Sequence, residues 1–218
     1  MGMQRIGAIA GIVGVGLFLV GGFSQGTSIP EVNAPSSEIA AFFADKQDVL
    51  RYALPLLLLA VTATGFFLLG LFDRMRARGA GTWAYGVLLG GASSGVLAVI
   101  TVVPLGVPVL KPGGGLSDAQ FVTVWGFQAA SYAAGPACDA IVLLSIAIPA
   151  AAPLWLRGFS GILAALAVVS VFGVSNAGVA TVGLVYSMLF FVWILAGSAW
   201  LLTTATAPSM EAAPARSA

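Results

Sequence analysis

The feature that most constrains this chain is a series of long apolar runs that contain almost no charge. Residues 6–23, for example, read IGAIAGIVGVGLFLVGGF, and residues 52–72 read YALPLLLLAVTATGFFLLGLF. About 20 apolar residues in a helix are enough to cross the hydrocarbon core of a bilayer. Only 8% of the residues are charged, against about 25% in an average soluble domain, so a water-soluble fold could not cover its surface with polar groups. The sequence therefore predicts an all-α, polytopic membrane protein.

We predict a six-helix transmembrane bundle that forms one domain over residues 1–205. A retained first helix is favoured over a cleaved signal peptide, because the first apolar run is long and lacks a small-residue cleavage motif. Residues 206–218, rich in alanine, proline and serine, are expected to form a disordered cytoplasmic tail. The six expected spans are about 6–23, 52–72, 83–105, 129–149, 160–175 and 180–203.

A helix of a different kind is expected between the first two spans, on the extracytoplasmic side. In the stretch SSEIAAFFADKQDVLRYA, residues 36–53, apolar residues recur at helical spacing and charged residues lie opposite them. This pattern is typical of an amphipathic helix on the membrane surface. A lid over a ligand site is the alternative. The apolar face contains Ile39, Phe42, Phe43, Val49 and Leu50.

The distribution of charge predicts the orientation of the bundle. With six spans and a cytoplasmic N-terminus, one side of the membrane receives Arg5, Arg74, Arg76, Arg78, Arg157 and Arg216. The other side receives Lys46, Arg51 and Lys111 together with Glu31, Glu38, Asp45, Asp48 and Asp118. Basic residues in short loops remain in the cytoplasm. Both termini are therefore expected to be cytoplasmic.

The residue types that are missing narrow the chemistry. The chain has no histidine and a single cysteine, Cys138, which excludes haem held by axial histidine, His-ligated metals and sites with several cysteines. No Walker A, GxSxG or HExxH pattern is present. The net charge of +1 gives no basis for nucleic-acid binding. We therefore expect no enzymatic activity and no cofactor, with the lipid bilayer as the main partner.

Asp139 is the one charged residue well inside a long apolar run, and it is the candidate functional residue. An aspartate at the centre of a transmembrane helix costs about 2.5–3.5 kcal/mol on insertion scales, so a partner or a role is expected. Gly135 and Pro136 precede it by one turn and are expected to break the helix. The candidate partners are the hydroxyls of Thr62, Thr64, Ser93, Ser94, Thr101, Ser170, Tyr186 and Ser187. Asp139 is either a site for a proton, a cation or a polar substrate group, or a neutral carboxyl hydrogen-bonded to these hydroxyls, or a group that lies nearer the membrane surface.

Glycine pairs four residues apart predict where helices pack closely. Small residues at this spacing let two backbones approach each other in lipid. The rows serve either packing within the chain's own bundle or an interface with a second copy or a partner subunit. The pairs are Gly7 with Gly11, Gly86 with Gly90, and Gly91 with Gly95.

The layout resembles a group of bacterial multi-pass membrane proteins classified as a domain of unknown function and common in high-GC actinobacteria. The similar segments are the Gly-rich first span, SSEIAAFFADKQDVLRYALPLLLLA, GLFDRMRARG, LSDAQFVTVWGFQAASYAAGP and APLWLRGFSGILA. The resemblance implies six helices in a bacterial cytoplasmic membrane. It implies no particular activity.

Two functional hypotheses follow from these observations. The first is a non-enzymatic accessory or assembly component that packs through its Gly/Ala-rich helix faces, as a homo-oligomer or with a membrane partner subunit. The alternative is a small transporter or channel-like protein for protons, cations or a lipophilic solute. It would use Asp139 beside the expected break at Gly135 and Pro136.

Overall fold

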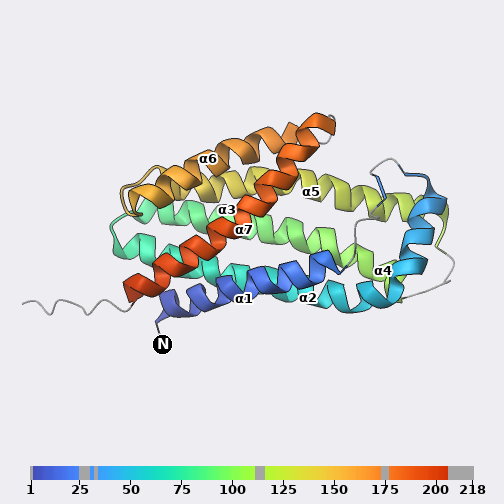
Figure 1. Ribbon diagram of the computed structural model, residues 1–218, viewed down its shortest axis with the longest axis horizontal. Coiled ribbons are helices and arrows are strands. Elements are labelled where there is room, and N and C mark those ends of the chain that lie inside the picture. Colours follow the sequence, from blue (N-terminus) through green and yellow to red (C-terminus); the bar gives the residue numbers. More distant parts are fainter. Residues whose placement is uncertain (1, 25–29, 32–33, 111–115, 173–176, 206–218) are drawn as a thin grey trace, which may run out of the picture.

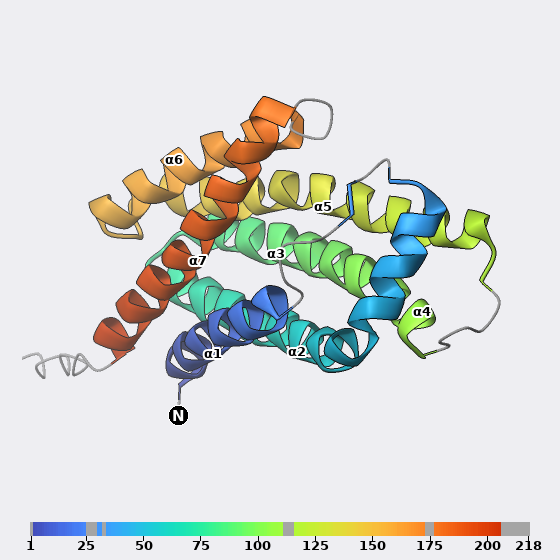
Figure 2. The ribbon, with the colours of Figure 1, turned by 45° about the vertical axis from the view of Figure 1, so that its right-hand side comes forward.

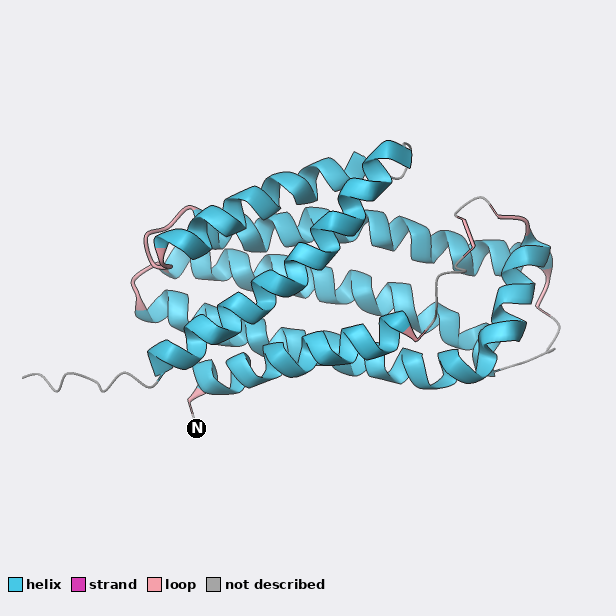
Figure 3. Ribbon diagram, viewed as in Figure 1, coloured by secondary structure: helices cyan, strands magenta, loops and turns pink. Residues whose placement is uncertain are grey.

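The computed structural model of this chain describes residues 2–24, 30–31, 34–110, 116–172 and 177–205. These residues form helices and loops without any strand (Figure 3), so the all-α prediction is confirmed. The predicted disordered tail, residues 206–218, lies outside the described residues. The helices are α1 (Met3–Phe23), α2 (Ser36–Ala77), α3 (Gly81–Val102), α4 (Gly106–Leu110), α5 (Asp118–Ala147), α6 (Leu154–Val171) and α7 (Ala177–Ala205), with a 3₁₀ turn at Val103–Leu105.

Five segments of this structure are long and apolar enough to cross a membrane. They cover Met3–Gly22, Gln47–Ala77, Gly81–Leu110, Leu154–Val171 and Val182–Thr204. The remaining predicted span, residues 129–149, falls in the second part of α5, whose apolar portion Ala134–Ala147 is shorter than the other five. The assignment as a multi-pass membrane protein therefore rests on these five helical segments.

The long helices lie side by side, and successive long helices run in opposite directions (Figure 1). α1 packs on α2 and α7, α3 packs on α2 and α5, and α6 packs on α5 and α7. One end of the bundle thus gathers the starts of α1, α3 and α6 and the ends of α2, α5 and α7. We call it the arginine end, because it carries Arg5, Arg74, Arg76, Arg78 and Arg157.

The predicted surface helix is not a separate element. α2 runs from Ser36 to Ala77 as one helix that contains both the amphipathic segment and the second span, with Pro55 inside it. Its first part nevertheless turns away from the rest and crosses the end of the bundle opposite the arginine end (Figures 1 and 2). The chain therefore changes direction between the amphipathic segment and the second span, but helical hydrogen bonding continues through the change.

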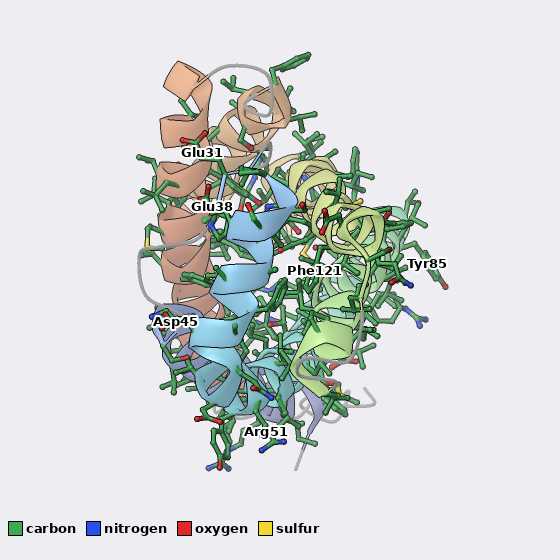
Figure 4. All side chains as sticks on the ribbon, turned by 90° about the vertical axis from the view of Figure 1, so that its right-hand side faces the viewer. Glu31, Glu38, Asp45, Arg51, Tyr85 and Phe121 are labelled. Carbon is green, nitrogen blue, oxygen red and sulfur yellow. The ribbon has the colours of Figure 1, made fainter. Side chains whose placement is uncertain are left out.

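The apolar face of this crossing segment covers the protein itself. Ile39, Phe42 and Phe43 are buried in a cluster that also contains Val109 of α4 and Trp125 of α5. Figure 4 looks onto this end, where Glu38, Asp45 and Arg51 lie on the segment and Phe121 of α5 lies beside it. The amphipathic pattern identified the buried face but not what it covers, because lipid and a neighbouring helix demand the same apolar surface.

The predicted helix break at Gly135 and Pro136 is wrong. α5 begins with a capping box, in which the Ser117 backbone N–H donates to Gln120 Oε1 at 2.8 Å, and it continues through Pro136 without interruption. Proline removes one backbone hydrogen bond, but packing of neighbouring helices can hold a transmembrane helix together across it. Contacts of α5 with α3 and α6 supply that support.

The start of the fifth predicted span is also wrong. α6 begins at Leu154, directly after Pro153, whereas the sequence placed the start at residue 160. Arg157 and Gly158 separated the apolar runs in the sequence and suggested a loop. The structure places them in the first turns of the helix, where an arginine can reach the membrane surface.

Candidate functional site

Asp139 lies in α5 at its interface with α3, and its side chain is half-buried. Ser94 of α3 donates a hydrogen bond from Oγ to Asp139 Oδ1 at 2.7 Å. Tyr186 of α7 donates from its phenolic hydroxyl to Asp139 Oδ2 at 2.8 Å. Each carboxyl oxygen therefore accepts one hydrogen bond, and the three side chains join three helices.

Ser94 and Tyr186 are both among the hydroxyls predicted as partners of Asp139. Five of the other candidates donate instead to carbonyls of their own helices, as hydroxyls in helices commonly do. Ser93 lines a shallow hollow on α3 together with Ala92 and Val96. The five that bond within their own helices are Thr62, Thr64, Thr101, Ser170 and Ser187.

Tyr186 makes a connection that the helix arrangement alone does not require. α7 packs mainly against α1 and α6, so the phenol reaches α5 across the interior of the bundle. Tyr186 is only 3% exposed, and its ring lies 5.7 Å from that of Phe190. A buried phenol requires a hydrogen-bond acceptor. Asp139 supplies that acceptor and thereby fixes α7 relative to α5.

The surroundings of Asp139 are those of a helix interface rather than a pocket. Two hollows lie on the described part of the chain, a groove of about 360 Å³ between α2 and α3 and the shallow hollow beside Ser93. Asp139 lines neither of them. Gly135, which was predicted to form a site with Asp139, faces open space, with no atom within 4 Å of a side chain added there.

Five of the six predicted packing glycines lie at close helix contacts within this chain. A methyl group at Gly7 would come within 2.8 Å of Gly70 Cα and 2.9 Å of the Phe66 carbonyl oxygen on α2. A methyl group at Gly90 would come within 2.8 Å of the Cys138 carbonyl oxygen on α5. Gly11 faces Ser198 and Phe67, Gly86 faces Ser145, and Gly91 faces Leu68. These five therefore serve packing within the bundle.

Gly95 is the exception among the predicted packing glycines. A methyl group there would meet no atom within 4 Å, and the same holds for Gly65 on α2. Both glycines line the groove between α2 and α3, together with Thr62, Gly91 and Ala92. The second half of the Gly91–Gly95 pair thus remains open on the outside of the bundle.

Two arginines that the sequence did not single out bind backbone carbonyls at the end of α5 and in the turn after it. Arg157 donates from Nε to the Ala147 carbonyl and from Nη2 to the Ile148 carbonyl, both at 3.1 Å. Arg78 donates from Nη1 to the Ala151 carbonyl at 3.3 Å. Basic side chains often bind the last carbonyls of a helix. This tendency of basic side chains could have predicted the contacts only if the end of α5 had been known.

A second missed contact lies in the core. Trp193 of α7 donates from its indole N–H to Ser160 Oγ of α6 at 2.8 Å, and both residues are fully buried. An indole N–H usually finds a partner when it is buried. The sequence contained no indication that Ser160 was that partner.

Within the described ranges, no group of three or more histidine, cysteine, aspartate or glutamate side chains could hold a metal ion. No family model, curated protein or solved structure matches this chain. The class of protein therefore rests on the apolar runs of the sequence and the helices of the structure, not on a relative. It is an all-helical, multi-pass membrane protein in which a carboxyl and two hydroxyls join α3, α5 and α7.

Proposed function

We propose that this chain is a non-enzymatic accessory or assembly component of a bacterial cytoplasmic membrane. It spans the membrane six times, with α5 as the sixth helix and both termini in the cytoplasm. It functions by packing against a transmembrane helix of a partner subunit or of a second copy. A relation to the actinobacterial group is part of this proposal and concerns the membrane and the six helices, not the role.

Two features support the proposed topology. α5 runs alongside α3 and α6 (Figure 1) and carries an apolar portion in its second part, as a tilted sixth span would. The arginine end has five arginines, and the positive-inside rule assigns such an end to the cytoplasm.

The open groove between α2 and α3 carries the functional proposal. Gly65 and Gly95 line it, with Ala92, and an added Cβ at either glycine would meet no atom within 4 Å. At Gly7, Gly11, Gly86 and Gly90, by contrast, neighbouring helices fill the space. A transmembrane helix can approach closely where small residues leave room. Asp139, by contrast, is engaged by hydroxyls of the same chain and supports the bundle's own structure.

Gly95→Leu is expected to weaken association of the protein with its partner about tenfold or more, because the larger side chain overpacks the contact. The measurement is the mass and composition of the species purified in a gentle detergent. Gly16→Leu is the matched control. Like Gly95, Gly16 is a helical glycine with no atom within 4 Å of an added Cβ, but it is exposed and lies on α1.

The Cβ of neither leucine would meet an atom within 4 Å, so the two variants should unfold at similar temperatures. An unmutated protein that is strictly monomeric, with no co-purifying protein, contradicts the proposed function. Equal loss of association in Gly95→Leu and Gly16→Leu would show that the groove between α2 and α3 is not the site of association.

The alternative, transport through Asp139, receives less support from the geometry, since Asp139 lines neither hollow and both its oxygens accept hydrogen bonds. Its test is the flux of protons or cations into proteoliposomes. A flux that Asp139→Asn abolishes would favour transport over the accessory role.

A further inference from the structure

Arg74 is a side chain of the arginine end whose hydrogen-bonding capacity the chain leaves unused. It lies in the last turn of α2, half-buried, with its guanidinium over the indole of Trp200 of α7 at 5.8 Å from the ring centre. Its Nε is buried and makes no hydrogen bond to any described residue. A guanidinium has five N–H donors, and a buried donor without an acceptor is unfavourable. The buried Nε faces the protein, so an acceptor from outside the chain would bind the terminal Nη groups, which make no hydrogen bond to any described residue.

The neighbouring acidic residue does not supply this acceptor. Asp73 Oδ2 accepts a hydrogen bond from the Gln4 side-chain amide of α1 at 3.1 Å. Asp73 is also the sole acidic side chain that the described residues place at the arginine end. The ion pair between Lys46 and Asp45 belongs to the opposite end. The positive charge of the arginine end therefore has no sufficient counter-charge in the described protein.

The other arginines at this end differ from Arg74 in their contacts. Arg78 and Arg157 bind the backbone carbonyls after α5. Arg76 is exposed and lies over the ring of Phe72 at 5.5 Å. Arg5 is exposed. Among the five arginines of this end, Arg74 alone combines a platform beneath its guanidinium with a buried N–H that makes no hydrogen bond to any described residue. It is therefore the best-built anion position of this end.

The level of Arg74 in the membrane identifies the anion. Trp83 and Trp155 lie at the arginine end with 39% and 54% of their surfaces exposed. Exposed tryptophans are enriched at the level of lipid headgroups. The anionic group available at that level is a lipid phosphate, and arginine matches phosphate with two parallel hydrogen bonds.

We propose that Arg74 binds the phosphodiester of an anionic phospholipid at the arginine end, with the Trp200 indole as the platform beneath its guanidinium. The binding goes beyond the accessory role and does not depend on a protein partner. It gives the protein a lipid ligand and selects anionic lipids around α2 and α7.

Native mass spectrometry of the full chain in mild detergent tests this proposal with added phosphatidylglycerol and phosphatidylcholine of identical acyl chains. The unmutated protein should retain phosphatidylglycerol preferentially. Arg74→Gln should weaken that binding about tenfold, the usual effect of losing a hydrogen bond to a charged group. Phosphatidylcholine has the same phosphodiester, but the arginine end repels its choline cation, so its binding should be weaker at the outset and change less. Arg74→Lys should restore part of the difference, because it returns the charge without the planar fork.

Arg51→Gln is the matched control, because Arg51 is an exposed arginine of the same helix at the opposite end. It should bind phosphatidylglycerol like the unmutated protein. The lipid-free unfolding temperature of each variant separates loss of the site from loss of the fold. Unchanged lipid binding in a folded Arg74→Gln variant overturns the proposal. Displacement of the lipid by millimolar inorganic phosphate also overturns it, in favour of a soluble phosphate ligand.

Discussion

Gly7→Ala is expected to lower the free energy of unfolding by about 1–3 kcal/mol, the usual range for overpacking. The new methyl group would come within 2.8 Å of Gly70 Cα and 2.9 Å of the Phe66 carbonyl oxygen. Both are backbone atoms, so no change of rotamer can make room. α1 must therefore shift away from α2, the helix on which it mainly packs. Unfolding in a titration with sodium dodecyl sulfate, followed by circular dichroism, measures the change.

Gly16→Ala on the same helix is the control for this prediction. Gly16 is exposed, and an added methyl group would meet no atom within 4 Å. Alanine should therefore stabilise α1 there by up to about 1 kcal/mol, because it loses less backbone entropy than glycine. The same substitution thus has opposite expected signs at two positions of one helix. Equal effects at Gly7 and Gly16 would show that α1 does not pack on α2 as described.

Asp139→Ala is the second substitution with a large expected effect, a loss of about 1–3 kcal/mol of unfolding free energy. It removes the acceptor of both Ser94 and Tyr186. Ser94 can turn to a carbonyl of its own helix. The Tyr186 phenol has no such local alternative, so most of the loss should come from Tyr186. The same detergent titration measures it.

A double-mutant cycle separates the two hydroxyls. Tyr186→Phe should recover part of the stability lost in Asp139→Ala, because it removes the phenol that has lost its acceptor. Ser94→Ala should recover less. Asp139→Asn should lie close to the unmutated protein, since an amide still accepts one hydrogen bond and donates another. Independent effects of Asp139→Ala and Tyr186→Phe would contradict a direct bond between the two side chains.

Tertiary packing explains why some local predictions failed. Pro136 and Gly135 favour a break in an isolated helix, but α5, which packs on α3 and α6, continues through them as one helix. Gly95 follows the same spacing as Gly7 and Gly90, yet only the arrangement of helices decides which glycines meet a neighbour. The sequence predicted a set of candidate hydroxyl partners for Asp139. Ser94 and Tyr186 could be identified as the partners only from the positions of α3 and α7.

The sequence by itself determined the class of this protein, because long uncharged apolar runs can be stable only as membrane helices. It also determined that Asp139 needed a partner, since an isolated charge in lipid is unfavourable. The tertiary structure decided how those demands are met. It brought together Asp139, Ser94 and Tyr186 from three helices, filled five glycine positions and left Gly95 open. These outcomes depend on contacts between residues distant in sequence, and helical periodicity carries no information about such contacts.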